Sequence, residues 1–296
     1  MTTRKKNTQS KEEQQIKEEH TSPATNAEPL IISLGEEERI EAKGDVITEI
    51  PLEEEIVAAI GKTKIDLSSW TPKTTIGKEV KAGNITQIDY LLDNNIPILE
   101  EQIVDALLPN LETDLLLIGQ SKGKFGGGQR RVFRQTQRKT SEGNKPSFAT
   151  VAIVGNLNGY VGAGYGKSRE TVPAREKSLR NAKLRIFKIS RGCGSWECGC
   201  REPHTIPFKV MGKCGSTTII LMPAPKGKGL VVDGECAKIL RLAGIKDVWS
   251  KSFGQTRTKV NLIEACINAL HKLMKVKLRE EYIEQIGICE GPIRSA

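Results

Sequence analysis

Aromatic residues are scarce in this chain, which has three Trp, four Tyr and six Phe among 296 residues. Proteins that hold single-stranded nucleic acid stack its bases on aromatic rings, so this scarcity makes stacking a less favoured binding mode. Apolar runs of roughly 18 residues, the length of a membrane span, are missing as well. The first 14 residues also lack the apolar core of a signal peptide, and we therefore expect a cytoplasmic protein without a membrane partner.

A nucleotide-binding loop is missing too, although the stretch GYVGAGYGKS at 159–168 looks like one. The pattern G-x-x-x-x-G-K-[ST] requires a glycine at position 161, where the chain has Val161. What remains is Gly162, Gly164 and Gly166 at every second position, which in a strand lie on one face. A face without side chains lets another element approach the backbone closely, so we expect a helix to pack there.

Acidic residues are few in one part of the chain. Residues 120–191 hold 17 Lys and Arg against three Asp and Glu, an excess of 14 positive charges. Residues 1–55 show the opposite balance, with 7 Lys and Arg against 14 Asp and Glu. Like charges at the density of 120–191 repel one another, and a nucleic acid is the partner that relieves this repulsion.

The seven cysteines are an odd number, which does not suggest extracellular disulfides, and a reducing cytoplasm is the simpler interpretation. Four potential ligands lie within twelve residues in the spacing C-x4-C-x-C-x3-H: Cys193, Cys198, Cys200 and His204. Zinc favours four thiolate and imidazole ligands, so this spacing predicts a structural zinc, the one cofactor we expect. Three alternatives stay open: Cys214 replaces His204 as a ligand, His204 bonds RNA or the backbone, or the cysteines are buried thiols without a metal.

Hydrophobic periodicity divides the chain into five segments. They are an acidic extension over 1–64 that we expect to be disordered, a helical region over 65–119, a strand-rich segment over 120–191, a second α/β domain over 192–280, and a tail over 281–296. The second domain is predicted to hold two strands near 205–212 and 216–223, a helix near 234–243, a strand near 246–253 and a helix near 261–276. The tail is expected to be helical at first and then irregular.

The segment 120–191 is predicted to form three antiparallel strands, near 128–136, 147–155 and 159–166, followed by a helix. The dipeptide Asn158-Gly159 indicates a tight hairpin between the last two strands. The first connection is expected to be longer, polar and basic. Helical spacing would turn Ala174, Ser178, Ala182 and Ile186 toward the sheet and Lys177, Arg180 and Lys183 away from it.

Several motifs together resemble the ribosomal protein S-five family of the small subunit, in its archaeal and eukaryotic type, which eukaryotic nomenclature calls S-two. They are NGYVGAGYGKSRE, RNAKL, SRGCGSWECGCREPHTIPFKV, GKCGS, PAPKGKGLVV and LAGIKDVWSKSFGQTRT. The resemblance covers about 66–276 and implies an α+β fold. It implies a double-stranded-RNA-binding-like domain over 120–191, then a domain of the S-five second-domain fold over 192–280.

The resemblance also implies a function. A family member is a structural constituent of the small subunit that binds ribosomal RNA near the head–body junction and the messenger RNA entry path. Its neighbours are proteins of the S-three and S-four families, and it supports decoding accuracy without any enzymatic activity. By resemblance, the basic connection around Gln137–Lys145 is an RNA-inserting loop, and Pro225, Lys226 and Gly227 belong to a loop that faces the S-four neighbour.

Structured RNA is recognised largely by shape and by its phosphates, which Lys and Arg contact. The basic residues of the strand-rich segment are therefore the candidates for RNA binding. They are Lys122, Lys124, Arg130, Arg131, Arg134, Arg138, Lys139, Lys145, Lys167, Arg169, Lys177, Arg180 and Lys183.

Two other functions are weighed against this one. Pro225 to Leu230 fit P-x-x-x-G-L, which resembles the phosphate loop of small-molecule kinases, but Val232 and Asp233 stand where those kinases have two serines. A protein that regulates structured RNA away from the ribosome is the second alternative, and cosedimentation with small subunits separates it from a ribosomal constituent.

Overall fold

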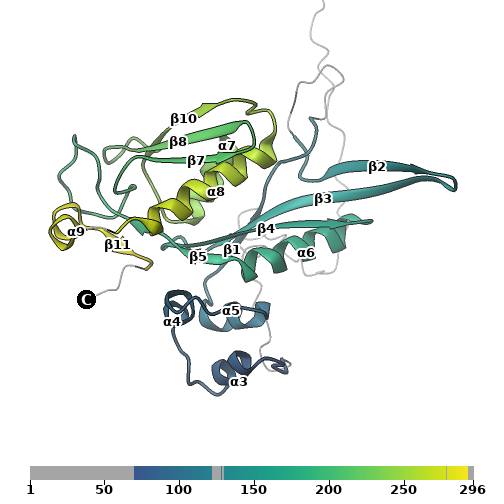
Figure 1. Ribbon diagram of the computed structural model, residues 1–296, viewed down its shortest axis with the longest axis horizontal. Helices are drawn as coiled ribbons and strands as arrows, with labels where there is room; N and C mark the ends of the chain where they lie inside the picture. The colour runs from purple at the N-terminus through teal and green to yellow at the C-terminus, as the bar shows by residue number, and fades with distance from the viewer. Residues whose placement is uncertain (1–69, 122–127, 129, 278, 293–296) are drawn as a thin grey trace, which may run out of the picture. The chain divides into compact units, whose positions relative to one another are not determined.

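A computed structural model describes residues 70–121, 128, 130–277 and 279–292 (Figure 1). The predicted disordered extension over 1–64 lies outside these residues. Within the described part of the chain, no helix combines the length and the apolar character that crossing a membrane requires.

Three short helices form the region before the first sheet: α3 (Thr75–Lys81), α4 (Ile88–Asp93) and α5 (Glu101–Leu107). They lie in the helical region predicted over 65–119, and buried apolar residues such as Leu91 and Ile103 hold α4 and α5 in the core. Glu100 ties the start of α3 to α5, because its carboxylate accepts the backbone N–H of Thr74 at 2.7 Å and the indole N–H of Trp70 at 2.9 Å.

A five-stranded sheet follows, made of β1 (Glu112–Leu115), β2 (Arg134–Thr140), β3 (Gly143–Gly155), β4 (Tyr160–Ser168) and β5 (Ile186–Lys188). The order is β1-β3-β4-β5, and β2 pairs with the other half of the same edge of β3 that β1 occupies. All pairings are antiparallel. The hairpin predicted at Asn158-Gly159 joins β3 to β4 and is confirmed, whereas β1, which precedes residue 120, was not predicted.

The prediction of a long loop between the first two strands is wrong. β2 and β3 remain paired out to Thr140 and Gly143, so they form a two-stranded ribbon that extends past the end of β4 (Figure 1). A tight turn is sufficient because Gly143 adopts φ +115°, a conformation that glycine tolerates. The predicted strand at 128–136 therefore lies several residues too early.

The helix α6 (Thr171–Leu184) packs on the glycine-lined face of β4, as predicted. A Cβ built on Gly162, Gly164 or Gly166 would lie less than 3.0 Å from backbone atoms of α6. Ala174, Ser178 and Ala182 form the matching buried stripe of the helix. Small residues on both elements therefore allow close contact between the two backbones.

The second domain is a four-stranded sheet in the order β7-β8-β10-β9 with two helices. Its elements are β7 (Val210–Cys214), β8 (Thr217–Pro223), β9 (Leu230–Val231), α7 (Gly234–Leu242), β10 (Val248–Phe253) and α8 (Lys259–Lys275). The predicted strand at 205–212 begins only at Val210, since Pro207 has no N–H to donate to a ladder. The other predicted elements of this domain are confirmed to within two residues.

The two domains share one apolar core. Val151 and Ile153 of β3 are buried with Ile239 of α7 and Leu262 of α8, whereas Ala152 and Val154 turn to the opposite face and pack with α6. Alternate residues of one strand therefore fill two cores, as the period of a β-strand requires. Figure 1 shows α6 and α8 on opposite sides of this sheet.

The described part of the tail, up to residue 292, is helical at first, as predicted, but it does not then become irregular. After α9 (Glu280–Ile286), the strand β11 (Cys289–Glu290) pairs with β6 (Ser190–Arg191), almost 100 residues earlier. Arg191 is buried there and donates to the backbone oxygen of Gly291 at 3.0 Å and to Asn158 Oδ1 at 2.8 Å. The C-terminal segment over 280–292 thus ties the second domain back to the first.

Candidate nucleic-acid interface and metal centre

The ribbon of β2 and β3 carries a group of four exposed cations. Arg134, Arg138, Lys139 and Lys145 are all exposed, and every residue of β2 before Thr140 is exposed. The register places Arg138 directly opposite Lys145, so two cations face each other across the ribbon. The only ion pair recorded here among the described residues joins Lys145 to Glu142 in the turn, at 2.8 Å.

The remaining predicted cations lie in two further places. Lys167 and Arg169 are exposed at the end of β4, and Lys177 is exposed on α6. Arg130 and Arg131 lie just before β2, next to a bridge between Ser121 and Arg130. Two predicted residues, Lys122 and Lys124, lie outside the described part of the chain.

Two cations of α6 face away from the sheet, as predicted, but toward α5. Lys183 pairs with Asp105 at 2.8 Å, and the two side chains are 13% and 9% exposed. Burial raises the pKa of Asp105, and the hydrogen bond from Lys183 opposes that rise. Arg180 lies 3.4 Å from Glu101 and remains exposed. Lys183 therefore acts first as an internal contact between two helices.

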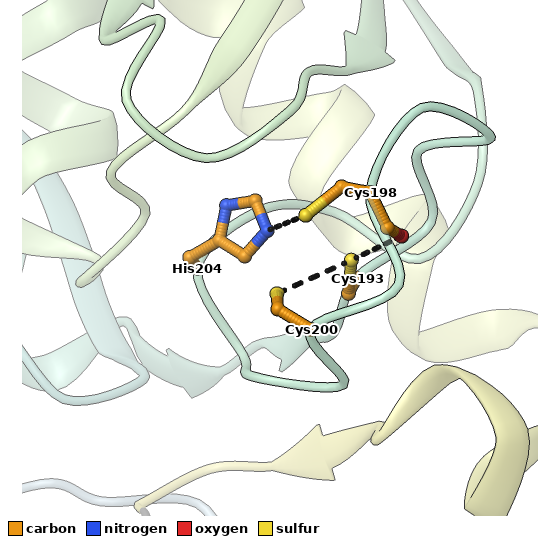
Figure 2. A group of neighbouring side chains, drawn as sticks. All are labelled: Cys193, Cys198, Cys200 and His204. Atoms are coloured by element: carbon orange, nitrogen blue, oxygen red, sulfur yellow. Dashed lines mark hydrogen bonds between the residues drawn. The ribbon is translucent and has the colours of Figure 1, made fainter.

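The four residues of the predicted zinc site come together in one cluster. The ligand atoms of Cys193, Cys198, Cys200 and His204 all lie within 4.8 Å of one another. Cys193 Sγ and Cys200 Sγ are 3.6 Å apart, and Cys198 Sγ is 3.8 Å from His204 Nε2 (Figure 2). Two sulfurs on a tetrahedral zinc with bonds of about 2.3 Å are roughly 3.8 Å apart, so the cluster has the dimensions of a zinc site.

The orientation of the histidine also suits a metal. His204 Nδ1 donates to Asp247 Oδ2 at 2.9 Å, and both side chains are buried. This hydrogen bond leaves Nε2, the nitrogen that faces the thiols, with a free lone pair. Asp247 is held in turn by the N–H of Gly229, at 2.8 Å from Oδ1.

The thiols of the cluster differ in acidity. Hydrogen bonds from the backbone N–H groups of Lys226 and Cys200 lower the pKa of Cys198 to about 6, so this residue is a thiolate at neutral pH. Burial, together with the neighbouring thiol of Cys200, raises the pKa of Cys193 to about 11. Cys198 is therefore a preformed anion, and a metal that recruits Cys193 must displace its proton.

The geometry bears on two of the other predicted arrangements of this region. Cys214 lies on β7 and donates to Glu264 Oε2 at 3.3 Å, so it is not part of the cluster. His204 bonds a carboxylate rather than the backbone, through its ring.

The predicted protein-facing loop adjoins the metal cluster. Lys226 and Gly227 are exposed, and Gly227 has φ +89° with no atom within 4 Å of the position its Cβ would take. The Lys226 ammonium pairs with the Glu202 carboxylate at 2.7 Å. The backbone N–H of Lys226 donates a hydrogen bond to the Cys198 sulfur. The loop is thus fixed at both ends, by Cys198 and by Asp247.

Sequence reasoning missed the carboxylate behind the histidine. Asp247 is 43 residues from His204, and its segment GIKDVW shows no ligand spacing. Arg257 lies in the motif SFGQTRT, beyond the basic segment over 120–191, and its backbone oxygen accepts from Arg130 Nη2 at 3.4 Å. Both residues lie in the motif LAGIKDVWSKSFGQTRT, and the resemblance of that motif to the S-five family was the available signal.

An exposed basic ribbon on a two-domain α+β scaffold is typical of a nucleic-acid-binding protein. Two family models agree: ribosomal protein S5, N-terminal domain, matches 129–190, and ribosomal protein S5, C-terminal domain, matches 212–282. The chain belongs to the ribosomal protein S5 family.

Its relatives are proteins named small ribosomal subunit protein uS5. The chain is 49% identical to that of Nanoarchaeum equitans over 229 residues, which are 77% of this chain and 98% of the relative. It is 48% identical to that of Methanocaldococcus jannaschii over 230 residues, 78% of this chain and 99% of the relative. For Staphylothermus marinus the identity is 46% over 209 residues, 71% and 91% of the two chains.

Proposed function

We propose that this protein is a structural constituent of the small ribosomal subunit, is cytoplasmic, and binds ribosomal RNA through the ribbon of β2 and β3 and the adjoining cations. The family membership and the names of the relatives support this role. This role asks the chain to bind and position RNA, and it requires no bond-making chemistry.

The observation that carries the proposal is the ribbon itself. An isolated two-stranded ribbon is marginally stable in water, and like charges directly opposite each other destabilise it further. Here the strands extend beyond the sheet with Arg138 facing Lys145. RNA phosphates between or beside these cations would turn the repulsion into attraction, so the ribbon is built for a polyanion.

The domain formed by β2, β3, β4 and α6 supports recognition of folded RNA. We infer that it is the double-stranded-RNA-binding-like domain predicted from the sequence, because three antiparallel strands are followed by a helix on one face of the sheet. Lys167, Arg169 and Lys177 lie on its exposed parts and extend the basic surface beyond the ribbon. Contacts of this kind read the shape and backbone of RNA rather than its sequence.

Charge reversal tests the proposal. Replacing Arg130, Arg131, Arg138 and Lys139 by Glu should weaken binding to transcribed small-subunit RNA and lower the slope of log K against log salt by about four times the single-contact value of roughly 0.7 to 0.9. The matched control reverses four cations outside the segment: Lys246, Lys251, Lys272 and Lys277. Equal affinity and slope in the ribbon variant and wild type would refute RNA binding by this surface.

We further propose that Pro225, Lys226 and Gly227 face the neighbour of the S-four family, close to a neighbour of the S-three family and the messenger RNA entry path, and that this contact supports decoding accuracy. The exposed loop, fixed at Cys198 and Asp247, supports this role. Gly227→Arg should raise misreading more than it affects subunit assembly. Gly227→Ala has the same backbone strain at positive φ without the bulk or charge, so it is the matched control.

A structural zinc on Cys193, Cys198, Cys200 and His204 is the second part of the proposal. The donor set, its dimensions and the Asp247 carboxylate behind the imidazole support it. The ion would clip the segment between the two domains and the Lys226 loop together, and it would supply no catalysis. Because the four ligands meet only when the segment over 193–204 is folded, metal binding would contribute to folding.

Elemental analysis tests the zinc. Native small subunits from a wild-type strain and from a Cys198→Ser, Cys200→Ser strain are compared for zinc per subunit, so that the other zinc proteins cancel. One zinc fewer in the variant is expected. Equal zinc contents would assign the cysteines to a plain thiol cluster.

Both alternative functions make distinct predictions. In the kinase alternative, the segment at Val232 and Asp233 serves a nucleotide. Asp233 instead caps α7 through Glu235 N–H at 3.4 Å and pairs with Lys259, so its carboxylate already has structural partners. ATP binding by the purified chain would reopen that alternative. A regulator away from the ribosome would bind structured RNA but would not sediment with small subunits.

A further inference from the structure

We propose that a basic pocket between the two domains is a second RNA-contact site, in which Arg257 of the second domain and Arg134 of the first hold the same stretch of RNA backbone. The pocket is a cavity of about 670 Å³. Its lining includes Gln120, Arg130 and Arg134 from the first domain and Arg257, Thr258 and Asn261 from the second. This inference rests on the proposed function and extends it to residues beyond 191.

The charges that line the pocket are of one sign. Arg130, Arg134 and Arg257 are among the lining residues that the structure describes, and none of those residues is Asp or Glu. Lys259 also lines the pocket, but its charge is balanced because it pairs with Asp233. Arg130 Nη2 donates to the backbone oxygen of Arg257 at 3.4 Å, so the first domain already contacts the rim that the second domain provides.

The chemistry of the lining matches a phosphodiester. Guanidinium groups bind phosphate oxygens through paired N–H donors, and clustered cations that repel one another gain most from an anion. Gln120, Thr258 and Asn261 add polar groups without an aromatic ring, so the lining suits a sugar–phosphate backbone better than a stacked base. The 17-residue helix α8 begins at this pocket, and its dipole adds to the positive field.

Continuity with the ribbon identifies the occupant. Arg134 is the first residue of β2, so the pocket lies where the ribbon leaves the body of the protein. An RNA that follows the cations of the ribbon would reach the pocket without a break. The occupant is therefore the backbone of the same folded ribosomal RNA rather than a free nucleotide.

The test compares two charge reversals on one helix region. Arg257 lies before the start of α8 and Lys277 lies after its end. A helix of this length separates the two positions by about 24 Å or more. Binding to transcribed small-subunit RNA is measured from about 0.05 to 0.3 M salt. Arg257→Glu should raise Kd roughly tenfold and lower the salt slope by about one, whereas Lys277→Glu should leave both near wild type. Circular dichroism melting confirms that both variants are folded.

A double-mutant cycle tests whether Arg134 and Arg257 share their RNA contact. The double variant Arg134→Ala, Arg257→Ala should raise Kd by less than the product of the two single effects. The shortfall should exceed about twofold. A simple product would place the two arginines on separate sites and overturn the shared pocket.

The outcomes separate the two proposals. If wild type binds ribosomal RNA with a steep salt slope and Arg257→Glu behaves like Lys277→Glu, the pocket is not an RNA site and the proposed function stands. If wild type itself shows no salt-dependent binding, the proposed function fails. If millimolar ATP competes with RNA for the pocket, the pocket is a nucleotide site instead. That result would also overturn the inference.

Discussion

Replacing Gly164 by Ala should separate α6 from the sheet. A Cβ at Gly164 would lie 2.6 Å from the carbonyl carbon of Asn181 and closer still to Ala182 N and Ser178 O, where ordinary contact begins at 3.4 Å. These are backbone atoms and cannot rotate away. The nearest, Ala182 N, would lie at 2.2 Å, so the helix must move by at least about 0.8 Å to reach 3.0 Å, the shortest distance that Cβ atoms normally show. A gap of that size forfeits a quarter to a half of each dispersion contact along the interface.

The expected loss in the free energy of unfolding is about 3 kcal/mol, at the upper end of overpacking effects, because both the helix and β4 lose packing. Since a typical domain has only about 5–15 kcal/mol in total, this is readily measured by urea unfolding of the purified chain. The matched control is Gly234→Ala, at the first position of α7, where no atom lies within 4 Å of the added Cβ. That control should be neutral or slightly stabilising. A change of less than about 0.5 kcal/mol in Gly164→Ala would refute the close backbone contact.

Three further predictions concern other contacts. Zinc affinity of the purified chain should rise at least about tenfold per pH unit between about pH 6.5 and 8. The reason is that Cys193, with its pKa raised to about 11, must release a proton when zinc binds. A flat pH profile would exclude thiolate ligation by Cys193. Removing residues 280–296 should increase zinc loss to a chelator, since Cys193 N–H donates to Ile286 O at 2.9 Å; an unchanged rate of loss would count against this coupling. Asp105→Ala should lower the free energy of unfolding by about 3 kcal/mol, because it leaves Lys183 buried without its partner. Glu142→Ala, which breaks an exposed ion pair, should lower it by less than about 1 kcal/mol. Equal effects of the two substitutions would contradict the role of burial.

The sequence was most informative where a local pattern has one physical meaning. Three glycines at period two, followed by small residues at helical spacing, predicted the contact between β4 and α6. The periodic apolar residues of the second domain placed α7 and α8 correctly. The cluster of Cys193, Cys198, Cys200 and His204 was also predicted, since ligands within twelve residues can meet without help from the rest of the fold.

Elements without a buried face were harder to predict. The outer part of β2 and β3 is polar on both faces, so no alternation marks it as a strand and it was taken for a loop. β1 and β11 are short strands whose partners, Val154 and Arg191 among them, lie far away in the sequence. Local propensity contains no information about such pairings.

Charge counting alone also misses long-range partners. Lys183 was grouped with the RNA-binding cations because its helix is basic, but the fold brings Asp105 to it from α5. Asp247 behind His204 and Arg257 beside Arg130 are two more examples. Each depends on the packing of the two domains, which only the tertiary structure reveals.

The central claim, that the protein is a constituent of the small ribosomal subunit, is tested most directly by sedimentation. A lysate of the native organism is separated on a sucrose gradient at low salt, and this protein is quantified across the fractions. We predict that it is recovered in the small-subunit and whole-ribosome peaks at one copy per small subunit, and that the four-residue ribbon variant shifts toward the top of the gradient. Recovery of the wild-type protein at the top of the gradient, with small subunits that lack it, would contradict the claim.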